Sequence, residues 1–248
     1  MKKHIPNAIT CCNLISGCIA TWFAFNSNFS LALIMIIVGA VFDFFDGMSA
    51  RLLNVSSPIG KELDSLADCI TFGLAPSAMI FSTLSYAYYY IGDGNIEREV
   101  AYEAHVYLPF LAFLMAAFSA LRLAKFNLDT RQALGFIGLP TPANALFWAA
   151  FVVTIQEHAA FLTQYHYAAI VVGMLVSCYL LVAEIPMFAL KFKHWGWKGN
   201  EVKYLFVLSS ILLLLLFGIG GIAVVIAWYV LLSVLTTDNK PTTLDLDE

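Results

Sequence analysis

Residues 43–68 read DFFDGMSARLLNVSSPIGKELDSLAD and place four aspartates between two strongly apolar segments. The segment before them reads LALIMIIVGAVF, and the segment after them reads CITFGLAPSAMIF. An aspartate inside a membrane helix costs about 2.5–3.5 kcal/mol on insertion scales. The four carboxylates, at Asp43, Asp46, Asp64 and Asp68, therefore indicate a functional site rather than an ordinary packing surface.

The composition around this stretch is that of a membrane protein. Of the 248 residues, 60% are hydrophobic and 12% are charged, and the mean hydropathy is +0.80. Soluble domains are about 45–50% apolar and about 25% charged. We expect an all-α fold, a polytopic transmembrane helical bundle forming a single integral membrane domain over residues 1–236, with a polar acidic tail over 237–248. The net charge of −4 does not suggest a nucleic-acid partner.

Apolar runs divide the domain into about eight spans, given that a spanning helix needs about 20 residues. The expected spans are 8–26, 30–53, 62–90, 107–126, 141–157, 167–190, 204–217 and 220–236. The last two come from one apolar run that GIGG interrupts, and one long helix is the alternative. Lys2 and Lys3 precede the first span, and lysine and arginine recur in every second loop, whereas the other loops hold one arginine and no lysine. Basic loops face the cytoplasm, so the turn between the aspartate pairs is expected there.

The spacing of the aspartates predicts two facing carboxylate pairs. Asp43 and Asp46 are three residues apart, and Asp64 and Asp68 are four apart, so each pair shares one helix face. The turn at 54–60 folds the second helix back against the first. The two nearby basic residues cannot neutralise four carboxylates, and acidic oxygens select a hard divalent cation. We therefore expect Mg²⁺ or Mn²⁺, in a site with room for two metal ions.

Small residues accompany the aspartates on the same helix face. Gly47 and Ala50 follow Asp46 by one and four positions. Small residues often line the seams between membrane helices, and for either residue alone packing is the simpler interpretation. Beside a metal cluster, we favour a ligand that lies against the helix backbone.

The whole stretch resembles the signature of the CDP-alcohol phosphotransferase family, D-x2-D-G-x2-A-R-x8-G-x3-D-x3-D. Every defined position matches, at Asp43, Asp46, Gly47, Ala50, Arg51, Gly60, Asp64 and Asp68. The resemblance implies a six-helix core and an enzyme that displaces CMP from a CDP-linked lipid or alcohol.

The resemblance also implies a role for each matched residue. Asp43, Asp46 and Asp64 would be principal metal ligands, and Asp68 would touch the metal site and act as general base. The other four matched positions, Gly47, Ala50, Arg51 and Gly60, are assigned to the CDP-diacylglycerol site: the small residues leave room for the cytidine, and the arginine meets phosphate or braces the acidic cluster.

Five further stretches resemble the serine-accepting bacterial branch of this family. They are IPNAITCCNLISG (5–17), LDSLADCITFGLAPS (63–77), ALRLAKFN (120–127), GFIGLPTPANA (135–145) and EIPMFALKFK (184–193). The branch implies transfer of the phosphatidyl group from CDP-diacylglycerol to L-serine, within the lipid of a bacterial inner membrane and with the active site facing the cytoplasm. The segment at 120–127 departs from the usual pattern by a lysine in place of arginine at 125, which keeps the charge.

Polar and basic residues outside the signature are candidates for substrate binding. Arg122 and Lys125 lie at the expected cytoplasmic end of their span, where they would bind serine or phosphate or simply belong to the basic belt. Asn127 would bind ligand or cap a helix. Three polar residues of the first span, Asn7, Thr10 and Asn13, would bind the cytosine of CDP-diacylglycerol or pack a polar seam.

Other functions fit parts of the same pattern. An enzyme of the same family would use glycerol 3-phosphate or inositol as acceptor. A divalent-cation transporter would use the aspartates as a transport site, but such sites lie near the midplane of the bilayer, and these aspartates are near one end of their spans. A purely structural membrane protein would not explain why the chain bears the free-energy cost of inserting these carboxylates into a membrane. A homodimer is left open.

Overall fold

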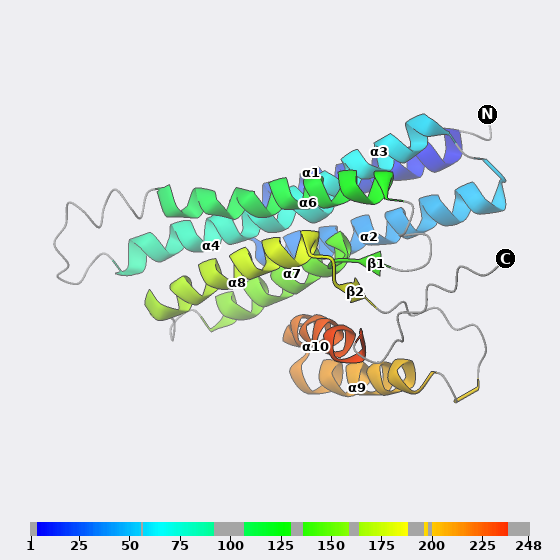
Figure 1. Cartoon of the computed structure of the whole chain (residues 1–248). Helices are drawn as coiled ribbons and strands as arrows, with labels where there is room; N and C mark the ends of the chain where they lie inside the picture. Colours follow the sequence, from blue (N-terminus) through cyan, green and yellow to red (C-terminus); the bar gives the residue numbers. More distant parts are fainter. Residues whose placement is uncertain are drawn as a thin grey trace.

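A computed structural model of the chain describes residues 4–55, 57–91, 107–129, 136–158, 164–187, 196–197 and 200–237. Long helices run nearly side by side in one bundle, and a shorter pair of helices lies against its flank (Figure 1). The elements, in chain order, are α1 His4–Phe25, α2 Phe29–Leu52, α3 Pro58–Asp68, a π-helix Cys69–Leu74, α4 Ala75–Ile91, a 3-10 turn Leu108–Ala112, α6 Phe113–Leu128, β1 Phe136–Ile137, α7 Thr141–Glu157, α8 Gln164–Val182, β2 Pro186–Met187, α9 Glu201–Phe217 and α10 Gly220–Thr237.

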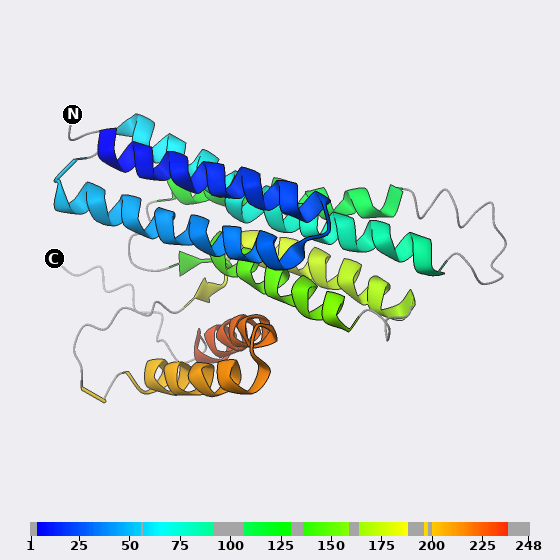
Figure 2. The ribbon, with the colours of Figure 1, turned by 180° about the vertical axis from the view of Figure 1, so that it is seen from behind.

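The predicted short turn between the aspartate-bearing helices is confirmed and has recognisable caps, but α3 packs mainly against α1 and not, as predicted, against α2. The Ser57 side chain accepts a hydrogen bond of 3.0 Å from the backbone N–H of Gly60. Pro58 follows at the first helical position, where its missing N–H leaves no helical hydrogen bond unmade. These residues begin α3 and turn it back beside α1 (Figure 2).

The core of the bundle lies between α1, α2, α4, α6, α7 and α8, and it includes the fully buried side chain of Phe72 from the π-helix. The largest fully buried side chains include Trp148, Met79 and Met115. Many outward-facing side chains of the bundle are large and apolar, among them Trp22 and Tyr179. A soluble protein would expose polar groups there, so this surface fits lipid.

The expected third span, 62–90, is a helix that changes its winding part-way. It begins at Pro58, continues to Asp68, and is followed without a break by the π-helix and α4. Gly17 of α1 and Gly39 of α2 come so close to Thr71 of this segment that added Cβ atoms would lie 2.3 and 2.5 Å from its side chain. The π-helix thus sits where three helices pack most tightly, beside the last aspartate.

The expected sixth span, 167–190, is too long at its C-terminus. The helix ends at Val182, and the chain then forms β2, which pairs with β1 (Phe136 with Met187 and Ile137 with Pro186). The N–H of Leu139, from the chain that enters α7, donates a hydrogen bond of 2.9 Å to the carbonyl of Leu180. A longer α8 would need this carbonyl for its own helical hydrogen bond. The all-α prediction is otherwise confirmed within the described ranges.

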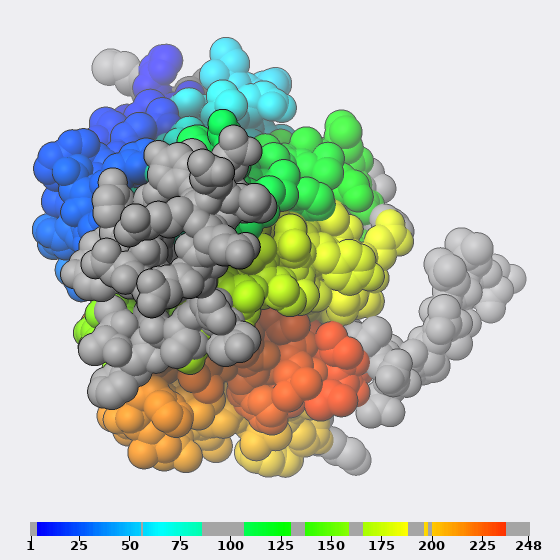
Figure 3. Space-filling view, turned by 90° about the vertical axis from the view of Figure 1, so that its left-hand side faces the viewer, coloured from blue at the N-terminus to red at the C-terminus, as the bar shows by residue number. Residues whose placement is uncertain are grey.

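The helices α9 and α10 pack as a hairpin whose α10 lies against α7 and β2. Viewed along the bundle, the orange and red atoms of this pair lie beneath the other helices and in contact with them (Figure 3). The chain turns at Gly218, which has a φ of +54°. The 204–236 run is therefore two helices, as predicted.

Helices occur in the described residues at all eight predicted positions, and four of them are long and apolar enough to cross a membrane. These four are His4–Phe25, Phe29–Leu52, Pro58–Ser85 and Leu108–Leu128. Shorter apolar helices occupy His166–Val182 and Gly220–Thr236. The molecule is a helical membrane protein. Nearly all of the predicted tail, from 238 onward, lies outside the described residues.

Candidate active site

Three of the four aspartates meet between α2 and α3. Each of Asp43, Asp64 and Asp68 offers a carboxylate oxygen within 4.8 Å of those of the other two. Asp68 is buried, with 9% of its surface exposed. Ionised carboxylates this close repel one another unless a cation lies among them, and hard divalent cations bind such oxygen clusters. This acidic cluster therefore fits a divalent metal ion by the chemistry of its donors.

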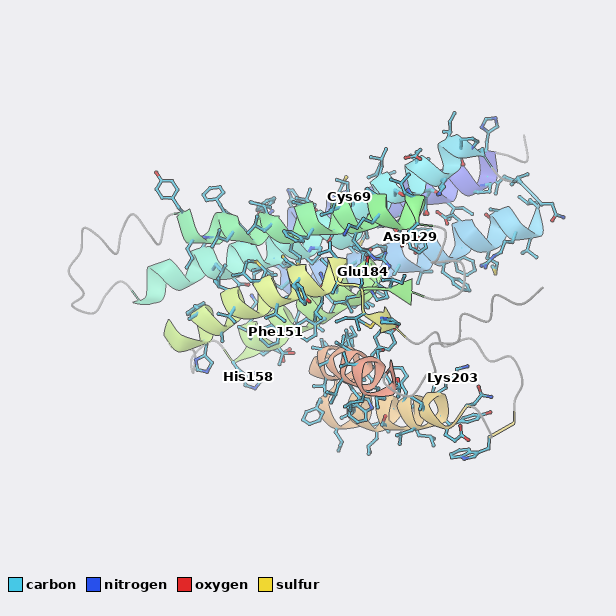
Figure 4. All side chains as sticks on the ribbon, viewed as in Figure 1. Cys69, Asp129, Phe151, His158, Glu184 and Lys203 are labelled. Atoms are coloured by element: carbon cyan, nitrogen blue, oxygen red, sulfur yellow. The ribbon has the colours of Figure 1, made fainter. Side chains whose placement is uncertain are left out.

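Asp68 is held in place from α1. The side-chain amide of Asn13 donates a hydrogen bond of 3.1 Å to its Oδ1. Asn13 is itself fixed, because its backbone carbonyl accepts a bond of 3.0 Å from the Thr71 hydroxyl. All three residues are buried. Cys69, the residue that follows Asp68, begins the π-helix and is labelled in Figure 4.

The fourth aspartate faces a cavity beside the cluster. Asp46 accepts a hydrogen bond of 2.5 Å from Thr10 of α1 and lies outside the group of three mutually close carboxylates. The cavity has a volume of about 250 Å³ and opens between α1, α2 and α3. It is lined by Pro6, Asn7, Thr10, Asp46, Gly47, Ala50, Val55, Ser57, Gly60, Lys61 and Asp64.

Most residues predicted to bind CDP-diacylglycerol line this cavity. Asn7, Thr10, Gly47, Ala50 and Gly60 all do so. A Cβ added at Gly47 would have no neighbouring atom within 4 Å, so it would project into open space. A Cβ at Gly60 would instead meet Ser57 Oγ at 3.0 Å, so this glycine permits a close approach of α3 to its own cap. The two signature glycines therefore act differently.

Two predicted donor-site residues lie elsewhere. Arg51 is exposed, and its Nε donates a bond of 3.0 Å to the carbonyl of Gly47 on the same helix. Its side chain does not line the cavity. Asn13 does not line it either, because its amide is directed at Asp68. The sequence pattern could not separate Asn13 from Thr10, since both lie on one face of α1.

The three residues predicted to bind serine or phosphate have different surroundings. Lys125 is exposed. Asn127 donates a bond of 2.8 Å to Ser65 Oγ, and its carbonyl accepts one of 2.9 Å from Lys61, so it ties the end of α6 to α3. Only Arg122 is buried, with 6% of its surface exposed.

The guanidinium of Arg122 is partly satisfied. Its Nη1 donates a bond of 3.0 Å to Thr141 Oγ1, and its Cζ lies 5.2 Å from the centre of the Phe126 ring. Its Nε and Nη2 are buried and have no hydrogen-bond partner among the described residues. Its charge interacts with that of Asp68. A buried cation with two free donors beside an acidic cluster is well suited to an anionic ligand.

The sequence interpretation missed several contributors. Lys61 and Ser57 line the cavity, and Thr141 holds Arg122. Lys61 lies within the signature stretch, but the signature leaves its position undefined, so the resemblance implies no role for it. Thr141 lies 19 residues from Arg122 in sequence, and no periodic pattern links the two.

The fold and this site define a helical membrane protein with an acidic, metal-compatible centre beside a cavity. The chain belongs to the CDP-alcohol phosphatidyltransferase family, whose model matches residues 3–179. That match ends inside α8, so β2, α9 and α10 lie beyond it.

Curated relatives narrow the comparison. The chain is 33% identical over 197 residues to the CDP-diacylglycerol–serine O-phosphatidyltransferase of Bacillus subtilis, covering 78% of this chain and 92% of the relative. Relatives of the same name are 35% identical in Helicobacter pylori, over 57% of this chain and 54% of the relative, and 32% identical in Methanocaldococcus jannaschii, over 62% and 63%. The chain thus spans about half the length of the Helicobacter pylori relative.

Proposed function

We propose that this protein transfers the phosphatidyl group of CDP-diacylglycerol to the hydroxyl of L-serine, giving phosphatidylserine and CMP. The observation that carries the proposal is the acidic cluster of Asp43, Asp64 and Asp68 beside a cavity lined by five of the eight signature residues. The name shared by the relatives supports serine as the acceptor.

The donor's nucleotide occupies the cavity in this proposal. Gly47 and Ala50 offer bare backbone and a methyl group to the ligand, and Asn7 and Thr10 supply polar atoms from α1. Lys61 adds a positive charge at the same wall, where a pyrophosphate would lie. Arg51 has no contact role in this arrangement, because its side chain lies outside the cavity.

Asp68 accepts the proton in the reaction. The serine hydroxyl oxygen forms a bond to the phosphorus that carries diacylglycerol, and the bond from this phosphorus to the oxygen of CMP breaks. The hydroxyl proton passes to the Asp68 carboxylate, whose orientation is fixed by the Asn13 amide. A carboxylate is a weaker base than an alkoxide, so the proton leaves as the new bond forms.

Asp43, Asp46, Asp64 and Asp68 would hold Mg²⁺ or Mn²⁺, with space for two ions in this proposal. A divalent ion there supplies neutralising charge for the phosphoryl oxygens and for the departing CMP. Asp46 shares its carboxylate between this role and the hydrogen bond from Thr10.

The site faces the cytoplasm of a bacterial inner membrane in this proposal. Basic residues in alternate loops support that orientation. The location also fits the substrates: serine and CMP are water-soluble, whereas the acyl chains remain in the lipid around the bundle.

The direct test is to incubate the purified protein with CDP-diacylglycerol, Mg²⁺ or Mn²⁺ and separate acceptors: L-serine, glycerol 3-phosphate and inositol. Phosphatidylserine and an equal amount of CMP are expected with serine only. Activity with another acceptor but not serine would overturn the acceptor assignment. Metal uptake into sealed vesicles without CMP release would favour a transporter.

A further inference from the structure

Three of the stretches that mark the serine-accepting branch meet in one structural unit that the signature does not explain. Arg122 comes from the stretch at 120–127, β1 and Thr141 from the stretch at 135–145, and β2 from the stretch at 184–193. They lie on α6, on the chain entering α7, and on the chain leaving α8. The family match ends before β2, so part of the unit lies outside the common family core.

The unit is a clasp formed by β1, β2 and the glycine that follows β1. Gly138 has a φ of +76°, which other residues rarely adopt, and an added Cβ would lie 2.7 Å from the carbonyl oxygen of Leu181. Its N–H donates a bond of 2.9 Å to the carbonyl of Ile185. Glu184, labelled in Figure 4, lies where α8 gives way to β2. The clasp therefore fixes the start of α7 against the end of α8.

The residue that the clasp positions is Thr141, the first residue of α7. It is fully buried, and Pro140 before it is extended. Its Oγ1 accepts the bond from Arg122 Nη1 at 3.0 Å. The clasp thus connects to the buried guanidinium through Thr141, three residues after Gly138.

The hydrogen-bond donors of Arg122 that have no partner among the described residues determine which ligands it can bind. A guanidinium presents its donors along edges, and one edge is formed by Nε and one Nη nitrogen. Thr141 occupies Nη1, and the unpartnered nitrogens in the described structure are Nε and Nη2. These two donors are parallel and fit the two oxygens of one carboxylate or phosphate.

The geometry points to Thr141 as a positioning residue for acceptor recognition: by holding Nη1, it leaves the Nε–Nη2 edge of Arg122 free for the carboxylate of the acceptor. This inference rests on the proposed serine transfer. Inositol has no anionic group for this edge, whereas the serine carboxylate and the phosphate of glycerol 3-phosphate both fit it, so the edge selects an anionic acceptor. A phosphate of CDP-diacylglycerol has the same bidentate chemistry, and the experiment separates the two sources.

The test compares Thr141→Val, which removes the hydroxyl and keeps the shape, with Thr141→Ser, which keeps the hydroxyl. KM and kcat are measured for L-serine and for CDP-diacylglycerol. L-serinamide, which lacks the carboxylate, is measured in the same preparation as an acceptor or as a competitor of serine. We expect Thr141→Val to raise the KM for serine roughly tenfold, with little change for serinamide or CDP-diacylglycerol, and Thr141→Ser to restore the wild-type value.

Thr154→Val is the matched control, because Thr154 lies on the same helix and its hydroxyl donates only to the carbonyl of Ala150 within that helix. It should leave both KM values unchanged. Equal loss with serine and serinamide, a rise in KM for CDP-diacylglycerol instead of serine, or no change in Thr141→Val would overturn the inference. If the wild-type protein does not use serine at all, the proposed function fails before Thr141 is tested.

Discussion

Substitution of Gly47 by alanine should stabilise the protein and impair its use of CDP-diacylglycerol. Gly47 lies within α2, where glycine is about 0.5–1 kcal/mol less favourable than alanine. The added Cβ would meet no atom within 4 Å, so the substitution causes no clash in the free protein. The full gain in helix stability from alanine should therefore appear as a higher free energy of unfolding.

The same methyl group would stand in the cavity of about 250 Å³ that also contains Ala50 and Asp46. A nucleotide lying against the bare backbone of Gly47 must move away from it. A displacement of about 1 Å at a reacting centre can lower a rate by about a hundredfold. We expect kcat/KM for CDP-diacylglycerol to fall between about tenfold and a hundredfold, with a larger loss in Gly47→Leu.

The assay pairs thermal unfolding in detergent with initial rates of CMP release over a range of CDP-diacylglycerol concentrations. Gly173→Ala is the matched control: it adds the same methyl to the interior of α8, where the new Cβ would lie 3.4 Å from the Trp148 ring, an ordinary contact. It should raise stability and leave the kinetics unchanged. A Gly47→Ala protein with wild-type kinetics for CDP-diacylglycerol would show that no ligand approaches this backbone.

Three further predictions test the remaining parts of the site. Asp43→Asn should lose both metal-dependent binding of CDP-diacylglycerol and activity. Asp68→Asn should keep most of this binding, and its single-turnover rate should fall by about 10²–10⁴, the usual contribution of a general base. Equal loss of binding in both variants would make Asp68 chiefly a metal ligand. Arg122→Ala should cost about 1.5–3 kcal/mol in kcat/KM for serine while thermal unfolding stays close to wild type, and unchanged kinetics with both substrates would return Arg122 to the basic belt. A single cysteine at Ser56, between α2 and α3, should resist a membrane-impermeant thiol reagent in intact cells lacking the native cysteines, and labelling from outside would reverse the topology.

The sequence was sufficient for the helices and the acidic cluster because both depend on local spacing. The aspartates share helix faces by their three- and four-residue separations, and the short turn brings both helices to the same end of the bundle. That α3 packs on α1 was not visible in the spacing. The prediction that Gly47 and Ala50 lie beside a ligand-sized space agrees with the cavity they line. The break at Gly218 was also visible, since glycine readily adopts its positive φ.

Contacts between distant segments could not be read in the same way. The hydrogen bond from Arg122 to Thr141 depends on how the chain between them returns, and this return depends on a strand pair of two residues each. Pro186 within the run at 167–190 favours a helix end before Ile185. The sequence could not place that end at Val182, because the competing donor, the N–H of Leu139, belongs to another part of the chain. The hydrogen bond from Asn13 to Asp68 was hidden for the same reason.

Small residues beside the aspartates have two physical roles, and the surroundings of the missing Cβ decide between them. At Gly17 and Gly39 a Cβ would collide with Thr71, so these glycines let α1 and α2 close upon the π-helix. That closeness allows the Thr71 hydroxyl to reach the carbonyl of Asn13, whose amide then holds Asp68.

At Gly47 the space is open, and in the proposed function the same absence of a side chain leaves room for the nucleotide. Alanine at Gly17 should therefore lower the free energy of unfolding, whereas alanine at Gly47 should raise it. The small residues near the aspartates therefore divide between two roles, helix packing at Gly17 and Gly39 and the proposed ligand binding at Gly47. Packing at one level of the bundle orients the Asp68 carboxylate, which in the proposed reaction accepts the proton of the serine hydroxyl.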